Sequence, residues 1–232
     1  MASSPLPEFD SSTAKLVNVL GTKHMNMIEH PRLYRLLGTY GNSTSVQSKR
    51  IEEEIASIFG QNATVLIIDM AGFSKITQQQ GIFYYLSLIK RMQDVVSMAV
   101  TRHKGTVIKF LADNAFIILD SPSASLACVE DIHHSLTEEN KLTPHMHPIR
   151  IATGIDCGHI LNINNSDMFG DPVNVASLLG EDTAKADEIM MTQRAFDCLS
   201  EADKQGWEFL TITCSGVDVD VAKRVYKPKT QS

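Results

Sequence analysis

The sequence has few positive charges and few cysteines, and both shortages narrow the classes of protein that it can encode. Its 21 Lys and Arg residues against 27 Asp and Glu give a formal net charge of -6, with no basic run. Nucleic-acid affinity rests on clustered Lys and Arg, so we expect no nucleic-acid partner. The four cysteines lie far apart and show no CxxC spacing: Cys128, Cys157, Cys198 and Cys214. They indicate neither a zinc site nor a disulfide framework, and reduced thiols fit a cytoplasmic chain.

Long apolar runs are also missing. The longest are short and strand-like, such as 65–68, and residues 1–10 lack the basic and apolar regions of a secretion signal. We therefore expect no transmembrane segment. At 232 residues and 43% hydrophobic, the chain can bury one core and carry an extension. We expect residues 1–60 to form a partly flexible, helical N-terminal extension and residues 61–232 to form one domain.

Hydrophobic periodicity predicts alternating strands and helices in the larger part. Apolar residues at helical spacing indicate helices over 46–59 and 81–102, and a continuous β-branched run at 65–68 is typical of a strand buried on both faces. Short apolar runs separated by Asp113 and Asn114 predict an antiparallel pair, since both residues tolerate turns.

The remaining elements follow from capping signals and from strand patterns. Ser121 with Pro122, Asp171 with Pro172, and Thr192 are typical of helix starts, and Gly180 of a helix end. Further strands are predicted over 149–160, 188–191, 207–213 and 217–226. The order favours an α+β fold with a ferredoxin-like βαββαβ core, followed by an αβ unit and a hairpin. The histidines His133, His134, His145 and His147 are predicted to lie at the surface, since no acids converge with them.

Two aspartates at strand ends are candidate metal ligands. Asp69 follows the strand 65–68, and Asp113 lies between the strands 107–111 and 115–119. Carboxylates are the oxygen ligands that hard divalent cations take, so the two acids could share an ion. A single Asp after a strand is more often a turn residue or a helix cap. The pair alone leaves both interpretations open.

Four motifs in order resemble the class III nucleotidyl cyclases, the catalytic domains of adenylate and guanylate cyclases. They read VLIIDMAGFSKI from residue 65, VIKFLADNAFIIL from 107, IATGIDCGHI from 151 and SDMFGDPVNVASLL from 166. The resemblance covers about residues 64–226, so it identifies 61–232 as a nucleotidyl cyclase homology domain. It implies an enzyme whose active sites lie between two such domains, in a homodimer or a heterodimer.

The resemblance also implies roles for the two acids and for a pair of base-reading residues. Asp69 and Asp113 would hold two Mg²⁺ or Mn²⁺ ions per site, with the backbone carbonyl of Met70 as a further ligand. Lys109 and Asp167 match the purine-reading pair. A lysine donor suits adenine N1 and a carboxylate suits the N6 amino group, whereas guanine presents the opposite pattern, so ATP is the expected nucleotide.

Further positions of the resemblance are partly kept and partly lost. Phe73 is assigned to nucleotide binding, and Asn174 matches the catalytic asparagine that orients the ribose. The family's arginine one turn after that asparagine is Leu178 here, and a lysine expected before Gly216 is Ser215. Two glycines that flank the second metal acid in the family are Ala112 and Asn114 in this sequence.

Two functions remain open at this stage. The first is an adenylate cyclase that converts ATP to 3',5'-cyclic AMP and pyrophosphate, acting alone as a dimer or as the metal-donating half of a heterodimer. The second is a weak or inactive homologue that binds nucleotide as a regulatory or structural subunit. Asp69, Asp113, Lys109, Asp167 and Asn174 favour the first, whereas Leu178 and Ser215 favour the second.

Overall fold

The computed structural model describes residues 30–72, 79–214 and 217–227. By its contacts the chain divides into two units, Met1–Ile55 and Ala56–Ser232. In the first, helices α2 (Pro31–Tyr40) and α3 (Ser45–Phe59, which continues into the second unit) are joined by two bonds. Arg32 pairs with Glu54 at 3.1 Å, and the Tyr40 hydroxyl donates to Glu52 at 2.7 Å.

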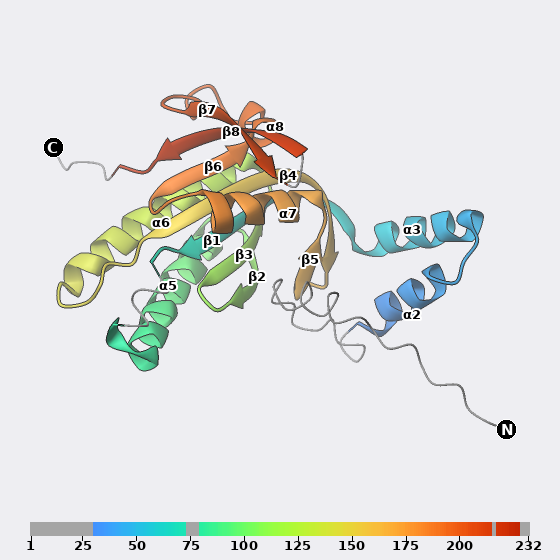
Figure 1. Cartoon of the computed structure of the whole chain (residues 1–232), viewed down its shortest axis with the longest axis horizontal. Coiled ribbons are helices and arrows are strands. Elements are labelled where there is room, and N and C mark those ends of the chain that lie inside the picture. The colour runs from blue at the N-terminus through green and yellow to red at the C-terminus, as the bar shows by residue number, and fades with distance from the viewer. Residues whose placement is uncertain (1–29, 73–78, 215–216, 228–232) are drawn as a thin grey trace. The chain divides into compact units, whose positions relative to one another are not determined.

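The second unit is built on a mixed sheet whose centre is β1 and β4 (Figure 1). In its described part the strand order is β2-β3-β1-β4-β6-β8-β7, and β5 pairs with β4. β1 is antiparallel to both β3 and β4, whereas β4 and β6 are parallel. The strands are β1 (Gly60–Met70), β2 (Thr106–Leu111), β3 (Asn114–Leu119), β4 (Ile151–Ile163), β5 (Asp167–Phe169), β6 (Glu188–Thr192), β7 (Glu208–Cys214) and β8 (Val217–Val225).

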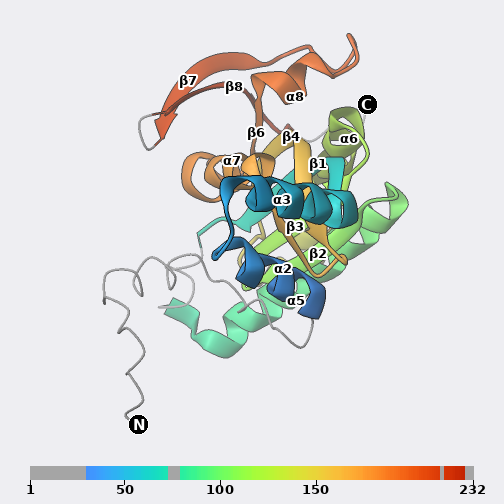
Figure 2. The same ribbon diagram turned by 90° about the vertical axis from the view of Figure 1, so that its right-hand side faces the viewer.

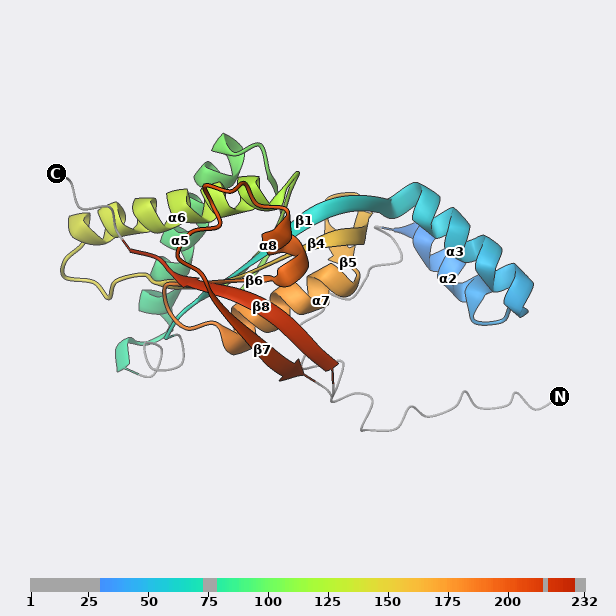
Figure 3. The ribbon, with the colours of Figure 1, turned by 90° about the horizontal axis from the view of Figure 1, so that it is seen from above.

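Helices cover both faces of this sheet (Figure 3). Helices α5 (Ile82–Arg102) and α6 (Pro122–Leu142) pack on one face, and α7 (Asp171–Ser177) packs on the other. The element order βαββαβ with β4 beside β1 is ferredoxin-like, so the predicted α+β fold class is confirmed. Figure 2 shows β7 and β8 as a curved hairpin at one end of the sheet.

The centre of β1 explains why the sheet needs helices on both sides. Residues 65–68 are all 0% exposed. Because successive side chains of a strand point to opposite faces, Leu66 and Ile68 join the core under α5 and α6. Val65 and Ile67 join the core under α7. Full burial of each such side chain contributes about 1.5–3 kcal/mol, so this strand anchors the fold.

Several local signals act as the sequence predicts. The Ser121 hydroxyl caps α6 by accepting from the Ala124 amide at 3.2 Å. Thr192 caps the short helix α8 (Gln193–Asp197) in the same way, accepting from the Ala195 amide at 3.3 Å. Among the helices of the described residues, none combines the length and the apolar character that crossing a membrane requires.

Other local predictions are wrong, and tertiary contacts explain them. The helix that begins at Asp171 does not end at Gly180 but continues as the π-helix η1 (Leu178–Thr183). Asp171 does not cap α7, because Gly170 occupies that position, and its carboxylate instead bonds Arg194 at 2.7 Å. His133 is buried, with its ring stacked on Tyr226 at 4.5 Å.

Candidate active site

The two candidate metal acids lie at one edge of the sheet, on elements that the β1–β3 pairing brings together. Asp69 is the last but one residue of β1 and pairs in register with Asn114, the first residue of β3. Asp113 lies in the turn just before Asn114. Directly opposed residues of antiparallel strands share a face, so the side chains of Asp69 and Asn114 point the same way.

Negative charge is concentrated around Asp69. Burial, followed by the charges of Asp113, Glu181 and Asp182, raises the pKa of Asp69 to about 7, against a weaker opposing hydrogen bond from the Met70 backbone. Burial is also the main cause that raises the pKa of Glu181; a hydrogen bond with Ser177 and the charge of Lys109 lower it, and the charges of Asp182 and Asp113 raise it. Several carboxylates thus lie within electrostatic range of Asp69, and such a group favours a cation beside it.

The turn that carries Asp113 is held in an uncommon conformation. Ala112 has a φ of 52°, in the left-handed region that glycine adopts more readily. Tyr85, from the buried face of α5, lies against the turn from the other side. Burial, together with the charge of Asp113 and a hydrogen bond to it, raises the pKa of the Tyr85 hydroxyl. Tyr85 thus holds Asp113 from the face of the sheet that α5 covers.

The donor set fits a hard divalent cation. Asp69 and Asp113 are two carboxylates with further negative charge behind them, and the end of β1 adds the backbone carbonyl of Met70. The described residues contain no group of three His, Cys, Asp or Glu side chains that would enclose a metal ion by itself. The two acids would hold such an ion together with oxygens from elsewhere, such as those of a substrate.

The predicted purine-reading residues form a pair in the structure. The Lys109 ammonium, on β2, bonds the carboxylate of Asp167, at the start of β5, over 2.7 Å. The two side chains are only 20% and 10% exposed. Lys109 also lies over the ring of Phe116, at 4.9 Å from its centroid, and the Met168 amide donates to Asp167 at 2.8 Å. Both groups are thus fixed in place by neighbours.

Asn174 and Leu178 lie on one helical segment that packs against β4. Asn174 is exposed on α7, and Leu178 is the residue at which α7 passes into the π-helix. The segment approaches β4 closely, because a Cβ on Gly154 would lie 2.1 Å from the Ala176 carbonyl and 2.5 Å from the Gly180 amide. No cationic side chain stands at the position of Leu178.

Three residues of the predicted site lie outside the described residues: Phe73, Ser215 and the adjoining Gly216. Two residues of the observed site were not predicted from sequence. They are Tyr85, which lies within the helix predicted over 81–102, and Glu181. A signal for Glu181 existed in the adjacent acids Glu181 and Asp182, which follow directly on the fourth motif.

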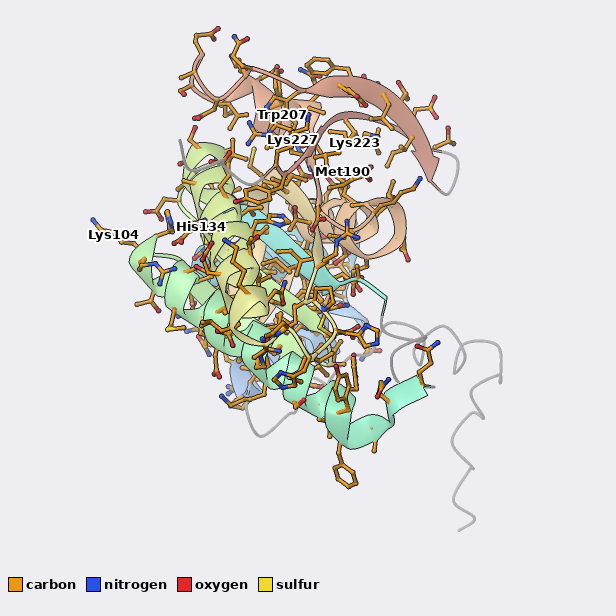
Figure 4. All side chains as sticks on the ribbon, turned by 90° about the vertical axis from the view of Figure 1, so that its left-hand side faces the viewer. Lys104, His134, Met190, Trp207, Lys223 and Lys227 are labelled. Carbon is orange, nitrogen blue, oxygen red and sulfur yellow. The ribbon has the colours of Figure 1, made fainter. Side chains whose placement is uncertain are left out.

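The largest of the described cavities lies elsewhere. It measures about 780 Å³, and its lining includes His103, Asp131, His134, Arg224 and Lys227. Figure 4 looks onto this side of the molecule, with His134 and Lys227 labelled. None of the candidate site residues is among the residues that line it.

Comparison with known proteins decides the family. A family model described as "Adenylate and Guanylate cyclase catalytic domain" matches residues 57–220, well over half of the chain. The chain belongs to this cyclase family. The resemblance of its four sequence motifs to nucleotidyl cyclases is thereby confirmed.

Curated relatives of this cyclase domain are distant and longer. A putative adenylate cyclase 3 of Rhizobium meliloti is 27% identical over 121 residues, which span 52% of this chain and 20% of that protein. The serine/threonine-protein kinase pkn2 of Myxococcus xanthus is 23% identical over 133 residues, 57% of this chain and 16% of that protein. The chain spans a fifth or less of the length of these two relatives.

Solved structures share the fold of this cyclase domain. The guanylyl cyclase Cya2 superposes with a TM-score of 0.62 at 16% identity, covering 75% of this chain and 97% of that one. The adenylyl cyclase CyaB from P. aeruginosa superposes with a TM-score of 0.57 at 18% identity, covering 75% and 99%. At such identities the likeness establishes the fold alone.

Proposed function

We propose that this cyclase domain converts ATP to 3',5'-cyclic AMP and pyrophosphate at an interface between two cyclase domains, with Mg²⁺ or Mn²⁺ held by Asp69 and Asp113. The observation that carries the proposal is the place of Asp69, at the end of β1 and paired with the residue that follows Asp113, where burial, followed by the charges of Asp113, Glu181 and Asp182, raises its pKa to about 7. Acids with strongly raised pKa values cluster at functional sites, which supports a role for Asp69 in binding a cation.

Each side chain has a part in the proposed reaction. Asp69 and Asp113 hold two divalent ions, which supply charge neutralisation for the triphosphate and a lowered pKa for the ribose 3'-hydroxyl. Lys109 donates to adenine N1, and Asp167 accepts from the N6 amino group, once the two exchange their mutual bond for the base. Asn174 orients the ribose. Guanine would place an N–H before Lys109 and a carbonyl before Asp167, so both groups would be mispaired.

The loss of an arginine at Leu178 determines how the sites are shared. Loss of one transition-state donor typically costs ~10²- to 10³-fold in rate. In a homodimer both sites would carry this loss, and turnover would be slow. In a heterodimer the partner domain supplies the missing cation, and this chain contributes the metal acids. We therefore propose that the chain is most active in a heterodimer, in which it contributes the metal-binding acids.

The test is formation of cyclic AMP by the purified chain with Mn²⁺ and ATP, alone and with candidate partner domains. Asp69→Ala and Asp113→Ala are expected to abolish the product. Asp120→Ala is the matched control, because it removes an acid from the other end of β3. If the wild-type chain forms no more cyclic AMP than the Asp69→Ala, Asp113→Ala double variant in any of these mixtures, the proposal fails. GTP in place of ATP tests the base-reading pair and should give less product.

A second candidate function, a catalytically silent nucleotide-binding subunit, is favoured by the missing cation at Leu178. Leu178→Arg separates the two. If the rest of the site is complete, the arginine should raise turnover by ~10²-fold, the lower end of what such a donor contributes. A silent subunit would bind ATP, measured by calorimetry, and would form no product with or without the arginine.

A further inference from the structure

Glu181 is connected to the candidate metal acids through one side chain, Asn114. The Asn114 amide nitrogen donates to the Glu181 carboxylate at 2.7 Å, across 67 residues of sequence. Asn114 follows Asp113 directly and pairs in register with Asp69. Glu181 is also within electrostatic range of both acids and of Lys109. Glu181 therefore interacts with both the acid pair and a member of the base-reading pair.

The carboxylate of Glu181 determines which way the Asn114 amide points. An ionised carboxylate only accepts hydrogen bonds, so the nitrogen of the amide must face it and the oxygen must face away. That oxygen, Oδ1, is buried and has no hydrogen-bond partner among the described residues. A buried acceptor left without a partner costs free energy, about 1–3 kcal/mol. Hard cations and the waters that they hold are partners for such an oxygen.

The backbone places Glu181 at this point by a specific arrangement. The π-helix Leu178–Thr183 begins where α7 would otherwise continue, and it widens the turn just before Glu181. Gly180 lies directly against β4 and β1, since a Cβ there would be 2.9 Å from the Gly154 amide and 3.0 Å from the Ile67 carbonyl. The next residue is thereby held beside the end of β1.

We propose that Glu181 is a positioning residue of the metal site. Through Asn114 it orients an amide oxygen toward the ions held by Asp69 and Asp113, and it steadies the turn that carries Asp113. This inference rests on the proposed function. Glu181 is not assigned as a ligand, because no three acidic or other metal-ligating side chains converge among the described residues.

The experiment measures Mn²⁺ affinity of the full chain without nucleotide, by electron paramagnetic resonance of the free ion. Glu181→Gln removes the requirement that the Asn114 nitrogen face position 181, because a glutamine amide can both donate and accept. Loss of a group that orients a metal site typically weakens affinity 10- to 100-fold, so we expect the Kd for Mn²⁺ to rise about tenfold. Asp182→Asn is the matched control: it removes the same charge one residue along the same π-helix, from an exposed side chain, and should change the Kd less than about twofold.

A double-mutant cycle tests whether Glu181 acts through Asn114. Asn114→Ala alone should raise the Kd about as much as Glu181→Gln, and adding Glu181→Gln to it should have little further effect. If Glu181→Gln fails to fold, as judged by thermal unfolding, Asn114→Ala carries the test by itself. An unchanged Kd in Asn114→Ala would then overturn the proposal.

The remaining outcomes separate this inference from the proposed function. Wild-type binding of Mn²⁺ that is lost in Asp69→Ala but kept in Glu181→Gln would overturn only the role of Glu181. Equal shifts in Glu181→Gln and Asp182→Asn would also overturn it, because they would reflect charge alone. No Mn²⁺ binding by the wild-type chain, with or without ATP, would overturn both proposals.

Discussion

Two aspartates on neighbouring strands of the same sheet have opposite surroundings. Asp156, on β4, is 0% exposed and is bonded by Arg194, by the Thr192 hydroxyl at 2.5 Å and by the Cys157 amide at 2.8 Å. Asp69, on β1, is less buried and has further acids around it. The charge of the more deeply buried carboxylate, Asp156, is balanced by a cation and by hydrogen-bond donors.

This difference distinguishes a structural acid from a functional one. Arg194 reaches both Asp156 and Asp171, so it ties β4 to the start of α7, and its pKa is held above the usual value mainly by the hydrogen bond to Asp156. Among the described residues, no ion pair links Asp69 to another helix or strand. Burial, followed by the charges of Asp113, Glu181 and Asp182, raises the pKa of Asp69, so a bound cation would offset the cost of its ionised form.

The largest expected effect comes from removing the compensating cation. Arg194→Met leaves the Asp156 carboxylate buried without its charge partner, and such a change typically costs about 3–5 kcal/mol of unfolding free energy. Urea denaturation at pH 7 measures it. Arg102→Met is the control: Arg102 is about as exposed as Arg194, at 50% against 47%, but its partner Asp131 is 25% exposed whereas Asp156 is fully buried. An ion pair that water can reach contributes under about 1 kcal/mol. Equal losses in the two variants would remove the distinction between the acids.

The next largest effect concerns the buried His133, whose contribution to stability depends on pH in the opposite direction to that of Asp69. Burial lowers the pKa of His133 to about 4, with Asp187 raising and Arg150 lowering it more weakly. Its neutral form is favoured in the folded state, so its contribution to stability is complete above about pH 6.5 and is lost as the pH falls toward 4. The loss is on the order of 3 kcal/mol.

Chemical denaturation at a series of pH values tests this prediction. His133→Gln should flatten the dependence between pH 6.5 and 4, whereas His134→Gln, at the exposed neighbouring position, should leave it as in the wild type. A slope that persists in His133→Gln would place the acid sensitivity in another group.

The smallest expected effect is the contribution of Asp69 to the unfolding free energy, and its sign shows whether Asp69 is a structural acid. Its raised pKa means that the folded state favours the protonated form, so its stabilising contribution is present below about pH 4 and is lost as the pH rises through 7. Asp69→Asn should therefore raise the unfolding free energy of the metal-free chain at pH 8 by about 1–2 kcal/mol, once solvent screening is allowed for.

Asp156→Asn gives the matched comparison at the same pH. It removes bonds to Arg194, and we expect it to lower the unfolding free energy, which is the opposite sign. If Asp69→Asn also destabilises the chain, Asp69 is a structural acid like Asp156. Added Mn²⁺ should stabilise the wild type and leave Asp69→Asn unaffected, because a ligand of the folded state raises its stability by mass action.

Local patterns in the sequence predict the structure correctly where that structure depends on interactions within a short segment. The apolar run 65–68 predicted a strand buried on both faces, and Ser121 and Thr192 predicted helix starts, because hydrophobic alternation and capping act within a few residues. The approach of Lys109 to Asp167 depends on pairing between distant strands. It was predicted only through the family resemblance.

What the sequence did not reveal depends on contacts between distant segments. The π-helix at Leu178 includes Gly180, which packs closely against Gly154 on β4, and no periodicity within the helix encodes that contact. The burial of His133 follows from its stacking on Tyr226, at the far end of the chain. Glu181 was missed for the same reason, since its partner Asn114 lies on another element.

Gly154 and Gly180 allow the backbones of β4 and the π-helix to approach closely, and a larger residue at either position could only increase the distance between them. Any side chain at either position would act as a wedge and push α7 and the π-helix away from the strands. Asp69 and Asn174 lie on the two parts that would separate, so such a wedge would widen the gap between metal acid and ribose-binding asparagine. The two glycines thus determine the distance between Asp69 and Asn174, and a homologue with larger residues at these positions would have a longer one.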